Sequence, residues 1–520
     1  MAKRMVLLLC LAAVLLLPSL CISQSKTAAA TAATRPTERS QPSAPATRLD
    51  VARCIELALQ NNNRSKISRD SVEMAVALHK QALSSWWPQI SGSVMASRMD
   101  EDPNFLFPSS GVSVPASVFT VPPSAITLPA NILGPGIPPV NAQLPIPPMT
   151  VNVPAQTIPI PEQDIKLMNR DNLLASLNAT LPIYTGGLRG SRIKQAKAGI
   201  EVARQDERHT DLEVAYDVRR LYYATVMTGQ LVKISKDTLA RMEATLELTE
   251  KMYTTGSGTV KKTDFLRNKS MVETIRGVVA EMESQEKVMR TTLLMVMGLD
   301  MAGPIELADT EVPFSPDPAD PKALIDAAFA ANPDIAKVSA AIKAAEAGVS
   351  AANSGHLPKL ALVGSARKIV NSFDAGVVTP VNKENWMIGI GVEIPIFQGF
   401  RVSNEVREQK ANLQKLQHQL TLLREATALE IRTTCFDLQK AREQEKASRE
   451  ALKSATENRE LNIRAYQEEL VETKEVIEAQ LMEALMAGQY QKVLFDNAQA
   501  RAKLDFVVGG NFKPAQPGVK

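Results

Sequence analysis

The chain has 520 residues, with 59 basic and 56 acidic side chains and a formal net charge of +3. This near balance gives no electrostatic support for nucleic acid binding. Aromatic residues make up only 4% of a chain that is 45% hydrophobic, which suits thin, closely packed helices better than a thick globular core. Two of the four cysteines, Cys10 and Cys21, lie near the N-terminus, and Cys54 and Cys435 lie far apart. A disulfide framework is therefore not indicated.

Residues 1–23 are typical of an export signal. Two basic residues precede an apolar run that ends at Leu17, and this run is too short to span a bilayer as a mature helix. Cleavage is expected near Cys21. Lipid attachment at that cysteine is an alternative, which the bulky Leu20 disfavours. Residues 24–48 are rich in Ala, Thr, Ser and Pro, and we expect them to be a disordered lead-in.

The remainder of the chain contains one pattern twice. Asn62 lies 26 residues before Pro88, and Asn332 lies 26 residues before Pro358, so the copies are offset by 270 residues. Duplication at a fixed offset indicates one structural unit used twice. We expect two repeats and a short flexible tail, at residues 49–310, 320–510 and 511–520.

A long insertion interrupts the first repeat. Pro182 corresponds to Pro395 and Tyr253 to Tyr466, and the offset between these later landmarks is only 213 residues. The missing 57 residues must lie upstream of Pro182, where residues 103–161 contain 15 prolines. This composition favours extended, polyproline-like chain whose backbone stays solvated.

Two helices open each repeat. The first helix begins near Asp50 in one copy and near Pro321 in the other, and it ends at Asn62 or Asn332. The second is expected over residues 65–85 and 335–353, ending before the proline that starts a strand.

Four segments show the two-residue alternation of strands that have one apolar face and one small or polar face. In the two clearest, Leu177 and Ile390 belong to the apolar face, and Asn178 and Gly391 belong to the other. Each strand has about 8 to 11 residues, the length that a tilted strand needs to cross a bilayer. Because four strands are too few to close a barrel and an open edge is unfavourable in lipid, several chains would share one barrel of 8 or 12 strands.

Long helices follow the strands. Residues 402–465 contain neither Gly nor Pro, and leucines within 413–423 have the spacing of a heptad seam. Residues 188–253 form the matching stretch in the first repeat. After each long helix we expect a turn and a return helix, which ends at Gly298 in one copy and at Gly509 in the other. Such rods need neighbours to bury their seams.

This order of elements resembles the outer-membrane efflux proteins of the TolC family. The resemblance is carried by Asn62 and Asn332, by the prolines that start the first strands, and by a Pro-Ile-aromatic-x-Gly motif at Pro182–Gly186 and Pro395–Gly399. It covers residues 49–510 and implies a mainly helical, TolC-like α/β-barrel fold with transmembrane β-strands. Members of the family are homotrimers that share a 12-stranded barrel in outer-membrane lipid and a helical tunnel in the periplasm. They bind an inner-membrane pump or transporter through a periplasmic adaptor protein.

The resemblance also implies where a pore entrance would lie. Glu475 and Glu478 follow the second periplasmic turn and match positions at which this family places acidic rings, so three chains would bring six carboxylates around one axis. The alternative is a solvated pair on an outer helix face, where Glu is common. Tyr253, Asp264 and Tyr466 are expected at the periplasmic turns.

No pattern predicts catalysis. The four histidines are scattered without metal-ligand spacing, and no nucleophile, base or metal arrangement is evident. We therefore expect no enzyme activity, no cofactor or metal, and no nucleic acid partner.

We interpret the chain as an exported outer-membrane channel of a tripartite efflux or type I secretion system, passing small compounds or polypeptides. The proline-rich insertion would lie outside the cell, in the first hairpin loop. The main alternative is a periplasmic coiled-coil structural or adaptor protein without a barrel. For the strands alone, the alternative is the edge of a soluble sandwich, which is disfavoured because no other β-rich segment is evident in the sequence.

Overall fold

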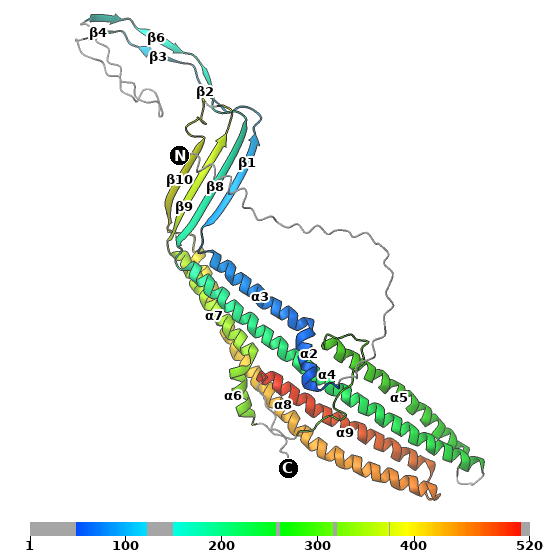
Figure 1. The fold of residues 1–520 in the computed structure, drawn as a ribbon. Helices are drawn as coiled ribbons and strands as arrows, with labels where there is room; N and C mark the ends of the chain where they lie inside the picture. The colour runs from blue at the N-terminus through cyan, green and yellow to red at the C-terminus, as the bar shows by residue number, and fades with distance from the viewer. Residues whose placement is uncertain (1–47, 122–148, 256–259, 316–319, 374, 511–520) are drawn as a thin grey trace, which may run out of the picture. The chain divides into compact units, whose positions relative to one another are not determined.

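The computed structural model describes residues 48–121, 149–255, 260–315, 320–373 and 375–510, and one series of elements occurs in it twice (Figure 1). The expected signal, most of the lead-in, the tail and the centre of the insertion lie outside these residues. The helices of the first copy are α2 (Val51–Asn61), α3 (Asn63–Ser84), α4 (Leu188–Thr254) and α5 (Lys262–Val296). Those of the second are α6 (Pro321–Ala331), α7 (Pro333–Asn353), the short η2 (Ser354–His356), α8 (Arg401–Gln467) and α9 (Thr473–Val508). The predicted duplication is confirmed.

In each copy an asparagine joins the two short helices and ties them to the return helix. The Asn62 side chain accepts a hydrogen bond from the Arg64 backbone N–H (2.7 Å) and donates one to the Val296 carbonyl (2.7 Å). Asn332 likewise caps α7 and donates to the Val507 carbonyl (2.8 Å). Both ends of the amide are therefore used, which explains why this residue type recurs at the same place.

A glycine ends each return helix against the same joint. Gly298 has a φ of +68°, and a Cβ there would lie 2.8 Å from the Asn61 backbone. Gly509 has a φ of +91°, and a Cβ there would lie 2.6 Å from the Ala331 carbonyl oxygen. Left-handed backbone and close approach both require glycine at these two positions.

Replacing Asn332 is expected to destabilise the helices. Asn332→Ala removes a helix cap and leaves the Val507 carbonyl without its side-chain donor, so we expect a loss of roughly 2 to 4 kcal/mol in the free energy of unfolding. Asn332→Asp keeps the capping oxygen but loses the donor, so it should destabilise the protein less than Asn332→Ala does. Thermal unfolding followed by circular dichroism measures both, with Asn458→Ala at an exposed position of α8 as the control. An unfolding temperature of Asn332→Ala equal to that of the control would contradict this role.

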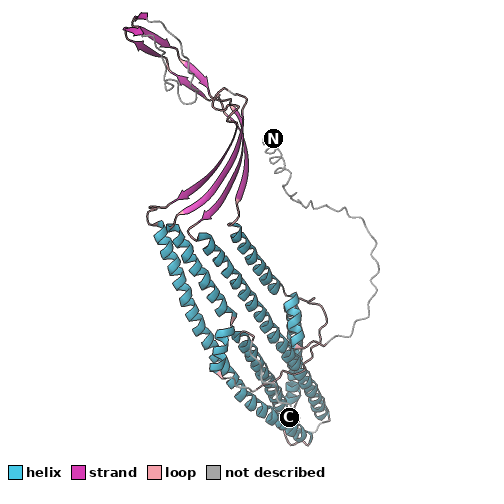
Figure 2. Cartoon of the chain, turned by 60° about the vertical axis from the view of Figure 1, so that its left-hand side comes forward, coloured by secondary structure: helices cyan, strands magenta, loops and turns pink. Residues whose placement is uncertain are grey.

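Four strands from the two copies form one antiparallel sheet in the order β1-β8-β9-β10 (Figure 2). They are β1 (Gln89–Arg98), β8 (Asp171–Tyr184), β9 (Lys359–Val370) and β10 (Glu384–Glu393). Strand β1 follows α3 and β8 leads into α4, while β9 follows η2 and β10 precedes α8. Because the strands are antiparallel, all four join their helices at the same end of the sheet.

The register places most of the larger apolar residues of all four strands on one face. Gly92 pairs with Leu177, Leu177 with Ala366, and Leu362 with Ile390. The larger apolar residues of this face are Ile90, Val94, Leu173, Leu177, Leu181, Leu360, Leu362, Trp386, Ile388, Ile390 and Val392.

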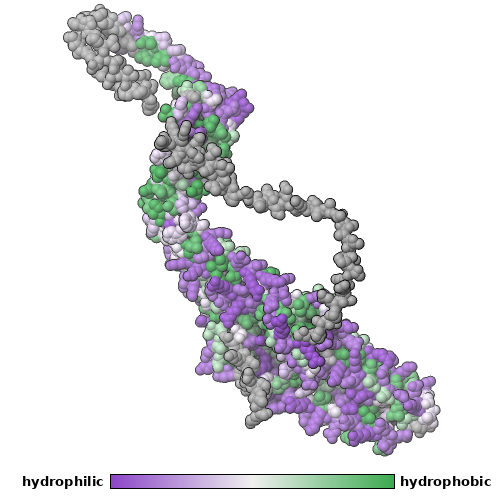
Figure 3. All heavy atoms as spheres, viewed as in Figure 1, coloured by the Kyte–Doolittle hydropathy of each residue, from purple (hydrophilic) through white to green (hydrophobic). Residues whose placement is uncertain are grey.

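The second face of the sheet carries mostly small and polar residues, including Asn178, which pairs with Ser365, and Gly391, which pairs with Ala361. A few larger apolar residues also lie on it, namely Met95, Leu174, Val363, Ile369 and Met387. The predicted alternation is therefore confirmed. The apolar face is uncovered, since Val94 is 72% and Ile390 is 68% exposed. Figure 3 shows hydrophobic residues gathered over the strands and hydrophilic residues over the helices. Within the described residues, the outer edges of β1 and β10 have no partner strand.

The proline-rich insertion differs from the expectation of solvated, polyproline-like chain. Its described part pairs with itself in three short antiparallel ladders, so it is a further β-rich segment of the chain. The strands are β2 (Asn104–Phe107), β3 (Ser110–Val114), β4 (Ser117–Val121), β5 (Met149–Val153), β6 (Gln156–Ile160) and β7 (Gln163–Lys166). Strand β2 pairs with β7, β3 with β6, and β4 with β5. Most of the prolines in these stretches fall between the strands, where they interrupt no ladder.

The helices pack as two hairpins, α4 with α5 and α8 with α9, and α4 also contacts α3, α7 and α9. The largest core cluster lies where α2, α4 and α5 meet, and its fully buried side chains include Val218, Tyr222, Leu293 and Met297. A second cluster joins α6, α8 and α9 around Ile431 and Leu504. In the described part of the chain, no helix is both long enough and apolar enough to cross a membrane.

Candidate functional site at the helix tips

The second helical hairpin ends in a tight turn that the structure describes in full. In the first hairpin, α4 ends at Thr254, and residues 256–259 lie outside the described ranges. In the second turn, α8 ends at Gln467, Glu469 has a φ of +60°, and the Leu470 N–H bonds back to the Ala465 carbonyl (2.8 Å). This left-handed residue turns the chain sharply into α9.

Tyr466 lies at the centre of a buried polar network that joins all four long helices. Its hydroxyl lies 2.9 Å from Thr249 Oγ1 on α4 and 3.0 Å from Thr473 Oγ1 on α9. Asn268 on α5 donates to the same Thr249 oxygen (3.2 Å). Thr249 and Asn268 are fully buried, and Tyr466 is 3% exposed. Buried hydrogen bonds of this kind hold one packing arrangement, because separating the helices would leave polar groups unpaired.

A second layer continues the contact between the two hairpins away from the tips. Gln480 on α9 is fully buried and donates to Thr245 Oγ1 on α4 (2.9 Å). The Glu483 carboxylate, on α9 as well, lies 3.1 Å from an Arg241 nitrogen of α4 and 2.9 Å from an Arg459 nitrogen of α8. Sequence reasoning did not identify this layer, because its members lie in no motif.

Glu475 and Glu478 lie in the first turns of α9 and point away from its packed side. Both are exposed, whereas the neighbouring Val476 and Ile477 are buried. Glu478 Oε1 lies 3.6 Å from Lys474 Nζ one turn earlier. Carboxylates are favourable at a helix N-terminus, so both glutamates are compatible with the helix while remaining available to solvent or to another copy.

The other residues expected at the turns have local contacts. The Tyr253 ring stacks on Phe265, with centroids 6.0 Å apart, so it closes the first hairpin. Asp264 Oδ2 accepts a hydrogen bond from the Lys261 backbone N–H (3.1 Å) and thereby caps α5. Of the three, Tyr466 has a side-chain hydrogen bond to the other hairpin.

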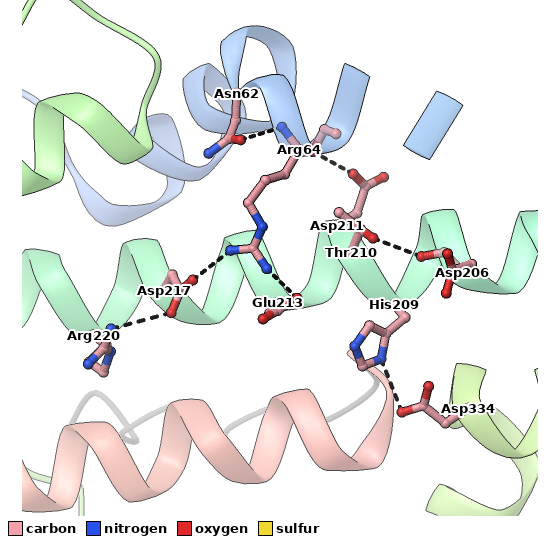
Figure 4. Close-up of polar contacts among 11 residues, drawn as sticks. Asn62, Arg64, Asp206, His209, Thr210, Asp211, Glu213, Asp217, Arg220 and Asp334 are labelled. Carbon is pink, nitrogen blue, oxygen red and sulfur yellow. Dashed lines mark hydrogen bonds and ion pairs between the residues drawn. The ribbon is translucent and has the colours of Figure 1, made fainter. Parts of the chain in front are cut away.

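A polar seam on α4 binds α3 and α7 (Figure 4). Arg64 of α3 pairs with Glu213 and with Asp217 (3.1 Å), both on α4. On another side of α4, His209 Nδ1 lies 3.0 Å from Asp334 Oδ2 of α7. The seam therefore links the first repeat to the second through charged groups.

The His209 contact predicts a pH dependence. The contact with Asp334 raises the pKa of His209 and the nearby Glu213 raises it further, while burial of the ring and the charge of Lys337 oppose the shift. A raised folded-state pKa means that the contact stabilises the fold fully below the ordinary histidine pKa of about 6.5 and that this contribution is lost as pH rises through the folded-state value.

We therefore expect His209→Gln to lower the unfolding temperature more at pH 5.5 than at pH 8.5. The effect should be modest because both side chains are partly exposed. Thermal unfolding at the two pH values measures it, with His79→Gln on α3 as the control. An equal decrease at both pH values would mean that His209 acts only through its packing on Phe506.

Among the residues that the structure describes, no three His, Cys, Asp or Glu side chains lie together in a way that could hold a metal ion.

Comparison with known proteins identifies the family. The sequence matches the family described as outer membrane efflux protein over residues 164–298 and 324–510, which is more than half of the chain. These stretches contain the long helices and most of the sheet strands of both repeats. The chain belongs to the outer membrane efflux protein family, which assigns it to the outer membrane.

Individual relatives are distant. The chain is 23% identical over 277 residues to the outer membrane efflux protein BepC of Brucella suis biovar 1 (strain 1330), covering 52% of this chain and 58% of that protein. It is 24% identical over 267 residues to the probable outer membrane lipoprotein SilC of Salmonella typhimurium, covering 46% and 54%. The chain thus spans just over half the length of these two curated relatives.

The fold has a close counterpart among solved structures. The outer membrane protein VceC from Vibrio cholerae superposes with a TM-score of 0.65 at 14% identity, over 89% of this chain and 97% of that one. The predicted fold class, a TolC-like arrangement of mainly helices with a β-sheet, is therefore confirmed.

Proposed function

We propose that three copies of this chain form a channel through the outer membrane, continued by a helical tunnel in the periplasm. The observation that carries this proposal is the four-stranded sheet, which has one uncovered apolar face, one mostly small or polar face, and two outer edges without partners in the described residues. Such edges are unfavourable in lipid unless a barrel closes. Three copies supply 12 strands, as the resemblance to the TolC family implies.

Helices α3 and α8 also expose apolar side chains that need a packing partner. On α3, Ile67 is 64% and Met74 is 62% exposed, and on α8, Leu422 is 66% and Leu429 is 63% exposed. These two helices flank the series α3, α4, α7 and α8, in which each contacts the next. Contact between α8 of one copy and α3 of another would bury these side chains and close a tunnel.

In this proposal the chain transports compounds and catalyses no reaction. It would pass small compounds or polypeptides, driven by an inner-membrane pump or transporter that binds through a periplasmic adaptor at the helix tips. The network around Tyr466 would hold the tips together, and Glu475 and Glu478 would line the entrance. A periplasmic coiled-coil protein without a barrel, the other candidate, leaves the uncovered apolar face of the sheet unexplained.

The assembly state tests the proposal. Protein extracted from outer membranes in mild detergent should be a stable species of three copies by native mass spectrometry. Without detergent it should stay with the outer-membrane fraction. A monomer that retains its full β-content, or release of the protein by osmotic shock alone, would contradict the proposal and favour the coiled-coil alternative.

A further inference from the structure

The insertion has a regular construction that its proline content alone does not reveal. Asn104 pairs with Lys166, Ser110 with Ile160 and Ser117 with Val153, so one register is kept through all three ladders. Prolines interrupt both strands at the same levels and at intervals of seven residues, namely Pro108, Pro115, Pro154 and Pro161. In the sequence the interval continues at Pro122, Pro129 and Pro147. The insertion is thus a repeating unit, with a strand of up to five residues and a two-residue break.

The two ladders nearest the sheet, β2–β7 and β3–β6, each have an apolar face. In the β3–β6 ladder, Val112 pairs with Ile158, and Ser113 pairs with Thr157 on the opposite face. In the β2–β7 ladder, Phe105 pairs with Ile165 on one face. In these two ladders the cross-strand pairing therefore places apolar side chains of both strands on one side, with Leu106 on the other side of the β2–β7 ladder.

These apolar faces are uncovered. Phe105 is 52%, Ile165 is 44%, Val112 is 50% and Ile158 is 54% exposed. A lone two-stranded ladder is marginally stable in water, and it needs packing on its apolar face to be stable. Among the described elements, β3 and β6 pack on each other, and no helix or sheet covers them.

The base of the hairpin is fixed to the neighbouring loop. The Val377 N–H donates to the Leu167 carbonyl (2.8 Å), and Lys166 Nζ lies 2.6 Å from Asp102 and 5.3 Å from the Phe373 ring centre. The β9–β10 loop, which supplies Phe373 and Val377, thus supports the hairpin where it leaves β1 and β8.

We propose that the apolar faces of these hairpins pack against the same faces of the other copies in the assembly, outside the membrane. This inference rests on the proposed trimeric channel. The hairpin prolongs β1 and β8, and the unpaired edges of β1 and β10 require copies around one ring. Three identical apolar faces therefore start from one rim, at an effective concentration in the millimolar range. Proline at every break hinders pairing between the strand edges of two copies. The hairpins of different copies would therefore meet through their apolar faces.

Cysteine cross-linking in the full-length protein, in outer membranes, tests this arrangement. Val112→Cys and Ile158→Cys place a thiol on the apolar face, and Ser113→Cys and Thr157→Cys place one on the opposite face of the same ladder. A short bismaleimide should link two copies at Val112→Cys and Ile158→Cys. At the control positions, Ser113→Cys and Thr157→Cys, it should give only the background of the unsubstituted chain. That background should be low because Cys54 and Cys435 are buried.

Three outcomes would overturn the inference while leaving the channel intact. The trimer could form normally without any cross-link between copies at either face, or the cross-links could be equally strong at both faces. Val112→Cys could also be linked to a different protein. Loss of the trimer in the unsubstituted protein would instead refute the proposed function. As a second measurement, Ile158→Asp should reduce the link at Val112→Cys to the background level, and Thr157→Asp should not.

Discussion

Arginine at Leu177 or Ile390 is expected to prevent most of the protein from reaching its assembled state in the outer membrane. Both residues lie on the apolar face of the sheet, and Ile390 is 68% exposed there. Arginine facing lipid near the midplane costs about 2 to 4 kcal/mol per site. Each substitution would occur three times in one barrel, so the cost for the assembly is several times greater.

The neighbouring positions provide matched controls. Asn178→Arg and Gly391→Arg put the same side chain one residue away, on the small and polar face, and at Gly391 no atom lies within 4 Å of an added Cβ. The measurement is the amount of trimer in the outer-membrane fraction on gels run without heating. We expect strong loss at Leu177 and Ile390 and near-normal amounts at the controls. An equal loss of trimer for substitutions on both faces would show that the sheet does not have one face in lipid and the other in water.

The fold was predictable where a pattern is local. Strand faces follow from alternation within ten residues, and the order of elements follows from landmarks such as Asn62 and Asn332 that recur at matched spacing. The structure adds the reason for those landmarks, because each asparagine bonds the end of a return helix more than 170 residues away. Sequence spacing revealed the position of these residues, but it could not reveal their partners.

The insertion shows how composition can mislead. Its proline content favours solvated chain, whereas the spacing of Pro108 and Pro115 leaves room for a strand between them. Proline prevents a ladder only where its missing N–H is needed. The positions of the prolines therefore carried the structural information, and their number did not.

The helix-tip network was beyond prediction for a different reason. Gln480 and Thr245 are 235 residues apart, and Tyr466 and Thr249 are 217 apart. Thr, Asn and Gln occur widely on exposed helix faces, so no residue type distinguishes the buried members. Only the packing of one hairpin on the other identifies them. For Glu475 and Glu478, the family resemblance supplied a hypothesis, and the exposure of both side chains is compatible with it.

Removing both Glu475 and Glu478 is expected to change the ion selectivity of the open channel. In three copies, Glu475→Ala with Glu478→Ala removes six carboxylates from the proposed entrance and leaves Lys474, which now lies near Glu478, without that partner. Carboxylate rings favour cations and bind multivalent cations, whereas amino groups favour anions. Single-channel recording in a planar bilayer should therefore show selectivity shifted toward anions and weaker block by multivalent cations.

A control must separate the entrance from charge elsewhere on the helices. Glu457 and Glu460 on α8 are also exposed and also three residues apart. Their replacement by alanine removes the same charge from another part of the helical hairpin, so it should leave selectivity and block nearly unchanged. Neither double variant removes a buried contact of the Tyr466 network, and trimer formation should persist in both. If the Glu475 and Glu478 variant kept normal selectivity and block, these glutamates would lie on an outer face and the constriction would be formed by other residues.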